Sequence, residues 1–423
     1  MLETMAKYVS ASLAILLLTL SLVAATTADD PSHSELSSKI SEHSLSYSPQ
    51  AQHFPNERLY RAYLVIQRFK SSITSDPKNI TTTWSGSDIC GKTRYAGFHC
   101  AITPGRAKIL TVTAIVFNGF GLRAPRLHSF IDQLPDVVIF QASSNNFGGD
   151  IPHLDGLEYM YKLSMYDDLH DQYSETKTTI GGNVGIGRLF QLTYKVGINF
   201  GHSNGRALLL NRNSLSGPLP ANLGISKLSY LALANNKLTG PIPSSIGQAK
   251  DSLLELLLLN NQLSGCLPHE LGMLTKTTVI DAGKNQLTGP IPQSFSCLSS
   301  VEQLNLGENR LYGQVPDALC KLGRLANLTL AGNYFSSVGP ACSALVKDGV
   351  LDVKRNCIPG LANQRAPAEC ASFMSQPKAS CPAASAPVSC PAEAAADAKK
   401  MAPEGRAAAK DYASYVTYAT LHE

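Results

Sequence analysis

One short pattern returns along this chain at a nearly constant interval, and that regularity limits the fold more than any other feature of the sequence. Each copy ends its apolar part on an asparagine, as in LALANNKLTGPIP and LLLLNNQLSGCLP. Aligned copies place this asparagine 23 to 25 residues apart, at Asn213, Asn236, Asn261, Asn285, Asn309 and Asn333. An earlier copy is anchored on Asn145, and a weaker one, IVFNGFGL, has Phe120 at the anchor position. A fixed period of this size indicates one structural unit used many times.

The unit is a leucine-rich repeat, because its core follows L-x-L-x-x-N-x-L. The alternating L-x-L part predicts a short strand whose leucines face one way. One repeat cannot bury that face alone, so repeats stack and their strands form a parallel sheet. We expect the asparagine amide to satisfy backbone groups at the bend, the following glycine to supply backbone freedom, and proline to stop the ladder. The predicted fold is an open α/β solenoid, with the sheet on its concave side and short helices, 3₁₀ turns or loops on its convex side.

The pattern is lost between Asn145 and Asn213. This gap is 68 residues, close to three periods, which predicts two further repeats inside it. One is LSMYDDLHD, with Asp168 at the anchor position, and the other falls near LTYKVGINFG. We therefore expect about ten repeats of roughly 24 residues over 106–340, with 163–205 as a degenerate part.

The first residues predict export from the cell. Residues 1–28 combine an early positive charge, the apolar run VSASLAILLLTLSLVAA and a small-residue end, as secretory signal peptides do. A membrane anchor is the alternative, but the small-residue end favours cleavage. No second apolar run of membrane-spanning length follows in the sequence. Two N-x-T sequons, at Asn79 and Asn327, predict glycosylation and agree with secretion.

Both ends of the solenoid need covers, since a terminal repeat leaves its hydrophobic face open. Residues 29–53 are polar and predict a disordered leader. Residues 54–105 predict an N-terminal cap, in which NERLYRAYLVIQRFKSSI has apolar residues at helical spacing behind Asn56 as N-cap. We expect the only tryptophan, Trp84, to lie in the core of this cap.

Ten cysteines in an exported chain predict disulfides. We expect a bond between Cys90 and Cys100 to staple the N-terminal cap. Residues 341–391 predict a cysteine-rich C-terminal cap, with Cys342, Cys357, Cys370, Cys381 and Cys390. The sequence does not give their pairing, and a disulfide-linked dimer through Cys370 or Cys390 stays open. Residues 392–423 are rich in Ala, Lys and Glu without a strong apolar face and predict a mobile tail.

Side chains between the inward leucines face the concave surface and are candidates for ligand binding. Leu209, Tyr230, Leu257, Leu259 and Val279 would form an apolar strip flanked by charges, which is typical of interaction sites. The alternative is that these side chains pack on one another without a ligand. The candidate binding residues are Tyr166, Arg212, Tyr230, Glu255, Leu257, Leu259, Asp281, Lys284, Asn305 and Glu308. A sugar on Asn327 would cover the C-terminal end of this surface, so we expect a ligand to avoid the last repeat.

Other activities have little support in the sequence. The net charge is only +4, and no basic tract with interleaved aromatic residues suggests nucleic-acid binding. GHSNG matches the G-x-S-x-G elbow but leads directly into a repeat strand and lacks its acid and histidine partners. GGNVGIG lacks the Lys-Ser/Thr ending of a phosphate loop. No C-x-x-C is present. We predict no enzyme, no cofactor and no metal site.

Several longer stretches resemble plant leucine-rich repeat extensin-like proteins. They are RLYRAYLVIQRFKSSITSDPKNITTTWSG, FNGFGL, the run from SGCLPHELGMLTKTTVIDAGKNQLTGPIP to GQVPDALCKL, and the closing NCIPG and QRAPAEC, so that the resemblance covers roughly residues 54–390. The resemblance implies a secreted, wall-associated protein that binds small cysteine-rich signalling peptides, the rapid alkalinization factors, in growth and wall-integrity control. KASCPAASAPVSCPAEAAA stands where the family's extensin module would begin, so the chain is similar to shorter members without that module.

Three functions from different classes remain open at this point. The first is a wall-localised binder of cysteine-rich signalling peptides, in which cell-wall polymers would be further partners. The second is an inhibitor of a wall-degrading enzyme such as polygalacturonase, which would need a face that accepts a large globular partner. The third is a structural wall glycoprotein. The caps and the cysteine-rich end, which resemble those of the family, favour the peptide binder.

Overall fold

The structure is a computed structural model. It describes residues 49–91, 95–102, 108–127, 129–148, 157, 159–165, 207–225, 228–378, 380–381, 390 and 415–418. The predicted signal peptide and most of the predicted leader lie outside these residues, as do the GHSNG and GGNVGIG motifs. Residues 50–423 belong to one compact unit, and the description below concerns that unit.

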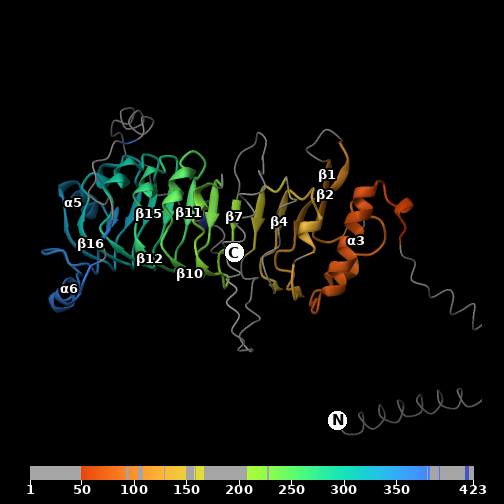
Figure 1. Ribbon diagram of the computed structural model, residues 1–423, viewed down its shortest axis with the longest axis horizontal. Helices are drawn as coiled ribbons and strands as arrows, with labels where there is room; N and C mark the ends of the chain where they lie inside the picture. Colours follow the sequence, from red (N-terminus) through yellow and green to blue (C-terminus); the bar gives the residue numbers. More distant parts are fainter. Residues whose placement is uncertain are drawn as a thin grey trace, which may run out of the picture. The chain divides into compact units, whose positions relative to one another are not determined.

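Among the described residues, eleven strands form a sheet to which each repeat contributes one strand (Figure 1). In spatial order they are β1 (Phe98–Ile102), β2 (Leu110–Val116), β4 (Ile139–Gln141), β6 (Lys162–Ser164), β7 (Ala207–Leu209), β9 (Tyr230–Ala232), β11 (Glu255–Leu257), β13 (Val279–Asp281), β15 (Gln303–Asn305), β17 (Asn327–Thr329) and β19 (Leu351–Asp352). Strand β1 is antiparallel to β2, and the pairings from β2 to β19 are parallel. The leucine-rich repeat solenoid is therefore confirmed.

The anchor asparagines form a ladder of hydrogen bonds at one end of these strands. Asn261 is typical: its Nδ2 donates to the carbonyls of Leu258 and Leu233, both at 3.0 Å, the second in the preceding repeat. Its Oδ1 accepts the backbone N–H of Leu238, also in the preceding repeat. Each asparagine thus satisfies backbone groups that burial would otherwise leave without partners. The expected role of the asparagine is confirmed.

The residue before each anchor asparagine bends the chain. It lies in the left-handed region, with φ between 50° and 75°, at Ser144, Arg212, Asn235, Asn260, Lys284, Glu308, Gly332 and Arg355. This conformation is uncommon for residues other than glycine, and the asparagine bonds on both sides of the bend hold it in place.

In the described part of the stretch between Asn145 and Asn213, one strand of the eleven-stranded sheet, β6, precedes β7. Strand β6 pairs directly with β7, with Lys162 opposite Ala207. Asn213 donates to the carbonyl of Met165 at 2.8 Å, which is the bond that an anchor makes to the repeat before it. The repeat predicted near LTYKVGINFG lies outside the described residues, and the described sheet runs directly from β6 to β7. Residues 166–206 themselves lie outside the described residues.

The solenoid also continues one repeat beyond the predicted limit at residue 340. Strand β19 is parallel to β17, and Asn356 is a buried anchor whose Nδ2 donates to the carbonyls of Leu330 and Val353, both at 3.0 Å. The segment LDVKRNCI carries this repeat, with Val and Ile in place of leucine. The predicted boundary between solenoid and C-terminal cap is corrected accordingly.

A second parallel sheet lies after the asparagines, where we expected only turns or loops. Its described strands are, in spatial order, β18 (Tyr334–Val338), β16 (Arg310–Val315), β14 (Gln286–Gly289), β12 (Gln262–Cys266), β10 (Lys237–Gly240) and β8 (Ser216–Pro218). A further pair, β3 (Arg123–Ala124) and β5 (Asn146–Phe147), lies nearer the N-terminus. Gly240, Gly265 and Gly289 have φ of 73°, 82° and 90°, so glycine supplies the expected backbone freedom.

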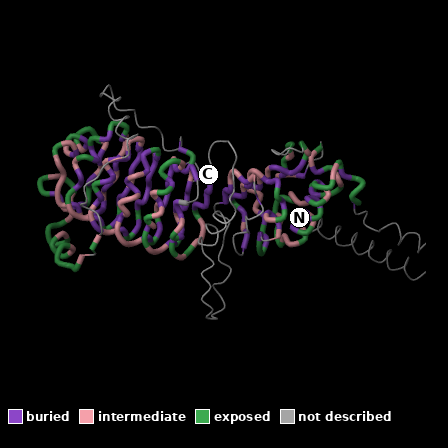
Figure 2. The backbone as a smooth tube through the Cα atoms, turned by 45° about the horizontal axis from the view of Figure 1, so that its top comes forward, coloured by how far each residue is buried: buried purple, intermediate pink, exposed green. Residues whose placement is uncertain are grey.

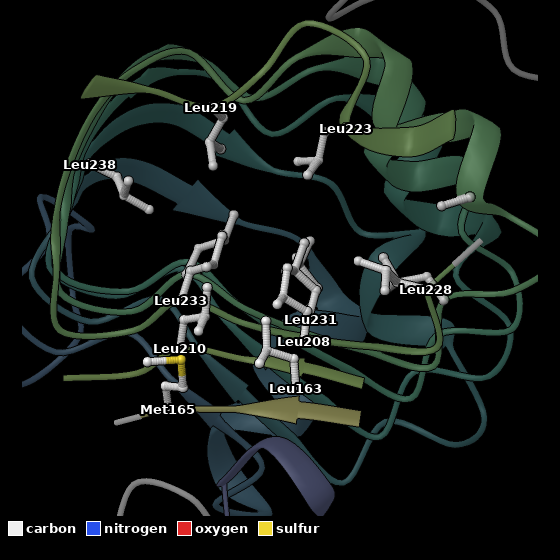
Figure 3. Packing of buried hydrophobic residues seen from close by; sticks show 14 of the residues in the cluster. Leu163, Met165, Leu208, Leu210, Leu219, Leu223, Leu228, Leu231, Leu233 and Leu238 are labelled. Carbon is white, nitrogen blue, oxygen red and sulfur yellow. The ribbon is translucent and has the colours of Figure 1, made fainter. Parts of the chain in front are cut away.

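Short 3₁₀ turns complete the repeats on the side away from the first sheet. They are η3 (Ile131–Gln133), η4 (Leu223–Ile225), η5 (Ser244–Ala249), η6 (His269–Met273), η7 (Gln293–Cys297) and η8 (Leu319–Lys321). The core fills the space between these turns and the two sheets, as the purple segments of Figure 2 indicate. Figure 3 shows Leu208, Leu231 and Leu233 from neighbouring repeats pointing into it together, so each repeat buries its leucines against the next.

The N-terminal cap is built around α3 (Glu57–Ser72), which packs on β2 (Figure 1). Asn56 is its N-cap and accepts the N–H of Leu59 at 3.0 Å. Trp84 follows η2 (Ile80–Thr83) and is fully buried, with its indole N–H donating to the carbonyl of Ala96. The cap starts earlier than predicted, since η1 (Ala51–His53) lies within the leader that we expected to be disordered.

The ten cysteines all lie in the described residues and all pair within the chain. The bonds are Cys90–Cys100, Cys266–Cys381, Cys297–Cys390, Cys320–Cys342 and Cys357–Cys370. The C-terminal cysteines therefore do not form a separate cap: three of the five bond to cysteines in the repeats. No thiol remains for the disulfide-linked dimer considered above.

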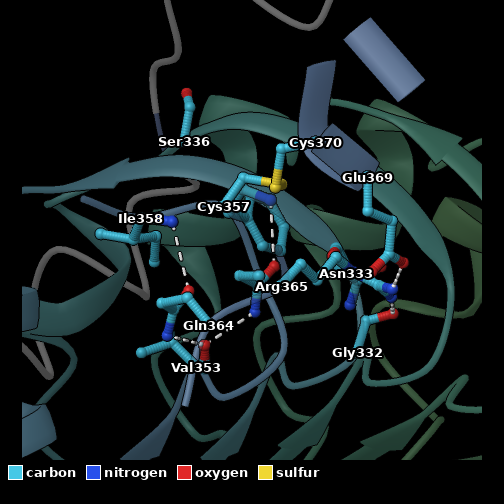
Figure 4. The surroundings of a disulfide bond; sticks show 12 residues. Gly332, Asn333, Ser336, Val353, Cys357, Ile358, Gln364, Arg365, Glu369 and Cys370 are labelled. Carbon is cyan, nitrogen blue, oxygen red and sulfur yellow. Dashed lines mark hydrogen bonds and ion pairs between the residues drawn. A yellow bond between two sulfur atoms is a disulfide. The ribbon is translucent and has the colours of Figure 1, made fainter. Parts of the chain in front are cut away.

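The C-terminal end of the solenoid is closed by α5 (Pro340–Lys347) and α6 (Pro367–Met374). Figure 4 shows how the chain between them is fixed beside the Cys357–Cys370 bond. Arg365 donates to the carbonyls of Asn333 and Gly332, at 2.7 and 3.0 Å, and forms an ion pair with Glu369. These bonds tie the segment before α6 to the carbonyls at the bend of the Asn333 repeat.

We expect Asn285→Ala to lower the free energy of unfolding by about 3 kcal/mol, because it removes an amide that bonds backbone groups of two repeats. The N–H of Leu263 loses its acceptor, and the carbonyls of Leu258 and Ala282 each lose one donor. Urea unfolding followed by circular dichroism measures the change. The control is Gln286→Ala, at the exposed neighbouring position, which should change stability by less than about 0.5 kcal/mol. Equal effects of the two substitutions would contradict the role assigned to the ladder.

The disulfide pairing predicts the products of a digest under non-reducing conditions. Mass spectrometry should find peptides that link Cys266 to Cys381 and Cys297 to Cys390. A peptide in which Cys381 is bonded to Cys390 would contradict this arrangement.

Candidate functional site

Alternate side chains of strands β7 to β15 point away from the core and form a face that we call the outer sheet face. It is the surface that the sequence predicts to be concave. On each strand the core leucine, for example Leu231 or Leu256, packs in the main hydrophobic cluster, whereas its neighbours in sequence do not. The outer sheet face comprises Ala207, Leu209, Tyr230, Ala232, Glu255, Leu257, Val279, Asp281, Gln303 and Asn305.

Four residues from the end of the chain, Tyr415–Tyr418, lie on this face. Tyr415 and Tyr418 belong to a second hydrophobic cluster, separate from the core. Its other buried members are Ala207, Leu209, Ala232, Ala234, Leu257 and Val279, and Tyr230 and Leu259 pack against it. The mobile tail predicted for 392–423 is therefore wrong at these four residues, because two tyrosines bury apolar area there. The rest of that segment lies outside the described residues.

Glu255 on β11 holds the backbone of the segment. Its Oε1 accepts the N–H of Val416 at 3.1 Å, and its Oε2 accepts the N–H and the hydroxyl of Thr417, both at 2.7 Å. Residues 416–418 form a single helical turn, so the carboxylate caps N–H groups that the turn itself cannot satisfy. Because Glu255 is itself buried, these charge-assisted bonds replace its lost hydration.

The two tyrosine hydroxyls also donate to carboxylates. Tyr418 donates to Asp281 on β13. Tyr415 donates to Glu302 at 3.0 Å and accepts from Gln303 Nε2 at 3.4 Å, both next to or on β15. The segment therefore contacts three neighbouring strands through apolar rings and hydrogen-bonding ends.

Burial changes the acid–base properties of this face. It raises the pKa of the Asp281 carboxyl above its usual value, and the bonds from Tyr418, Gly283 and Asn305 only partly oppose that effect. It also raises the pKa of the Tyr415 phenol, and that of Tyr230, where the charge of Glu255 adds to the effect. Both phenols therefore remain protonated and able to donate at neutral pH.

The structure brings together six of the ten predicted binding residues. Tyr230, Glu255, Leu257, Leu259 and Asp281 lie at the Tyr415–Tyr418 segment. Asn305 lies beside them and donates to Asp281 at 3.1 Å.

The remaining candidates lie elsewhere. Arg212, Lys284 and Glu308 occupy the exposed left-handed bends before the asparagines, beyond the ends of the strands. Tyr166 lies outside the described residues.

Sequence reasoning missed the residues whose partners are distant in the chain. Glu302 precedes its strand and therefore falls outside the L-x-L alternation. Gln303 occupies the same strand position as Tyr230 and Glu255, so alignment of the repeats contained the signal for it. The docking of Tyr415–Tyr418 had no periodic signal.

The face has the general chemistry of a binding surface: an apolar floor with a few fixed polar groups. Among the described residues, no three His, Cys, Asp or Glu side chains converge as a metal site would require. The described helices include none with the length and apolar character needed to cross a bilayer.

The raised pKa of Asp281 predicts a pH-dependent effect of Asp281→Asn. Since the folded pKa is raised, the folded state holds this proton more tightly than the unfolded state. Stability from this group is therefore full at low pH and is lost as pH rises above the usual aspartate value. We expect the Tm of the wild type, relative to Asp281→Asn, to fall as the pH rises above about 4. A difference that stays constant as the pH rises, measured by calorimetry, would contradict the assignment.

Comparison with known proteins relates the chain to plant proteins. A family model described as Leucine Rich Repeat matches residues 227–249. Leucine-rich repeat extensin-like protein 6 of Arabidopsis thaliana is 36% identical over 326 residues, which are 76% of this chain and 68% of that protein. Leucine-rich repeat extensin-like protein 1 of the same plant is 35% identical over 113 residues, 26% of this chain. This match spans only 15% of the length of protein 1, and a match to leucine-rich repeat extensin-like protein 4 of the same plant spans 19% of that protein.

A solved structure is similar over most of the solenoid. It is the leucine-rich repeat ectodomain of the plant membrane receptor kinase GASSHO1/SCHENGEN3 from Arabidopsis thaliana, in complex with CASPARIAN STRIP INTEGRITY FACTOR 2. The TM-score is 0.53 and the sequence identity 26%, covering 70% of this chain and 33% of that chain.

Proposed function

The chain belongs to the leucine-rich repeat extensin-like family, and from that premise we propose that it is a non-catalytic, extracellular protein of the plant cell wall. In this proposal it binds cysteine-rich signalling peptides of the rapid alkalinization factor type on its outer sheet face. Its five disulfides support a location outside the cell, where such bonds persist.

One observation carries the proposal: the outer sheet face holds a short peptide segment, Tyr415–Tyr418, through side chains that the sequence marks as candidates. Glu255 and Asp281 accept its amide and hydroxyl groups, while Leu257 packs against its tyrosines. A face that holds one peptide in this way has the apolar floor and the fixed acceptors that another peptide would use. The similar ectodomain, solved with a factor bound, supports the same use of the fold.

The predicted sugar site is compatible with this location. Asn327 lies on β17, opposite Gln303 on β15, and the Tyr415–Tyr418 contacts end at Glu302 and Gln303. A glycan on Asn327 would therefore border the site and would limit a ligand to the strands before β17. We keep the expectation that ligand binding avoids the last repeats.

Calorimetric titration of the secreted full-length chain with a panel of rapid alkalinization factor peptides tests the proposal. We expect at least one peptide to bind and Leu259→Glu to weaken it by tenfold or more, because a charge would replace an apolar side chain that packs against the second hydrophobic cluster. Tyr230→Ala should act in the same direction. The matched control is Gln262→Glu, which adds the same charge at an exposed position of β12 in the second sheet.

Two outcomes would contradict the proposal. One is the absence of heat with every peptide on folded protein, which would favour inhibition of a wall-degrading enzyme or a structural role in the wall. The other is binding that Leu259→Glu and Tyr230→Ala leave unchanged, since the peptide would then occupy a different surface.

A further inference from the structure

We propose that the outer sheet face contains a recognition site for a short, tyrosine-containing peptide segment without acidic groups, and that the chain's own Tyr415–Tyr418 fills it as a tethered occupant. An external ligand of this face must then displace the segment. The existence of the site stands on the contacts within this chain, and only the identity of the external ligand rests on the proposed function.

The contacts define which features of the segment are recognised. Glu255 accepts from two backbone N–H groups and from the Thr417 hydroxyl. On the other side of the segment, Asn211 Nδ2 donates to the Thr417 carbonyl at 3.4 Å. Tyr415, Thr417 and Tyr418 are buried, whereas 39% of Val416 is exposed. The site therefore selects a Tyr-x-Thr-Tyr pattern and tolerates any side chain at the second position.

The charges on the face define the chemical class of the segment. Three carboxylates, those of Glu255, Asp281 and Glu302, accept hydrogen bonds from it and are themselves buried. Each hydroxyl thus meets an acceptor, and a negative group in its place would lie against a carboxylate in a site with little water. Like charges at such distances repel strongly. A segment with a phosphate or sulfate on Tyr418, or with an acidic residue there, is therefore excluded.

The covalent connection gives the segment an advantage over any ligand in solution. Residues 391–414 join it to Cys390, and Cys390 is bonded to Cys297 in η7 of the solenoid. For connections of this kind the effective concentration of the tethered group is on the order of 1 mM. A free peptide that makes only the same contacts would need to reach about that concentration to replace half of the segment. A physiological ligand must therefore make contacts beyond those of Tyr415–Tyr418.

The experiment uses the full chain with the segment disabled by Tyr415→Ala and Tyr418→Ala together, which should leave the face empty. The probe is a fluorescein-labelled synthetic peptide of residues 411–423, DYASYVTYATLHE, followed by fluorescence anisotropy. We expect this peptide to bind the disabled chain at least tenfold more tightly than the wild type, whose face is already filled. Equal binding to both chains, or binding to neither, would overturn the proposal.

Matched variants locate the binding. In the disabled chain, Glu255→Gln should weaken the probe by tenfold or more, whereas Glu308→Gln removes the same charge from an exposed bend and should have no effect. In the probe, Val416→Lys should leave binding unchanged, and a phosphate on Tyr418 should abolish it. A probe that binds equally well with and without that phosphate would contradict the site.

Amide hydrogen exchange of the unmodified full chain gives an answer that does not depend on the folding of a variant. In peptides covering residues 411–423, the amides of Val416 and Thr417 should exchange at least tenfold more slowly than in the same sequence free in solution, because they donate to Glu255. Exchange at the rate of the free peptide would overturn the proposal. The proposed function fails separately: a disabled chain that binds the 411–423 probe but none of the cysteine-rich peptides would contradict that function and leave this inference standing.

Discussion

The rest of the structure depends on the amide of one asparagine per repeat. Each amide joins carbonyls of its own bend to a carbonyl and an N–H of the repeat before it, and the same bonds recur at Asn236, Asn261, Asn285 and Asn309. Because the ladder fixes one repeat against the next, every strand enters the sheet in the same register. That common register arranges the outward side chains in rows, so residues about a period apart in sequence become neighbours on one face.

The same repetition creates two open ends, and the chain closes them by different means. At the start, a helix and an antiparallel strand cover the first repeat, with Trp84 buried among aromatic rings. At the other end, Arg365 donates to the carbonyls of Asn333 and Gly332 and so ties the C-terminal segment to a repeat that it has already passed. The bonds Cys266–Cys381 and Cys297–Cys390 then return the chain to repeats that it has already passed.

The period was sufficient to predict the solenoid, the inward leucines and the role of the asparagines, because each repeat contacts mainly its neighbours in sequence. It also identified Tyr230, Glu255, Leu257 and Asp281 as outward-facing. Prediction failed where this locality ends. The bonds of Cys381 to Cys266 and of Cys390 to Cys297 join segments that are far apart in sequence, and so does the docking of Tyr415–Tyr418. No local pattern encodes these contacts. The repeat at Asn356 was missed for a simpler reason, since its strand has Val353 and Ile358 where leucine was sought.

The direct pairing of β6 with β7 has a consequence for how such an array can change during evolution. Met165 and Ala207 are far apart in sequence, yet Asn213 bonds to Met165 as an anchor does to the repeat directly before it. The pairing of these two repeats therefore does not require them to be consecutive in sequence. Closure of a loop costs little more as it lengthens, so such a junction can accept new sequence while both flanking repeats keep their partners. In a solenoid of this kind, a new domain can be inserted between two repeats while every strand keeps its register.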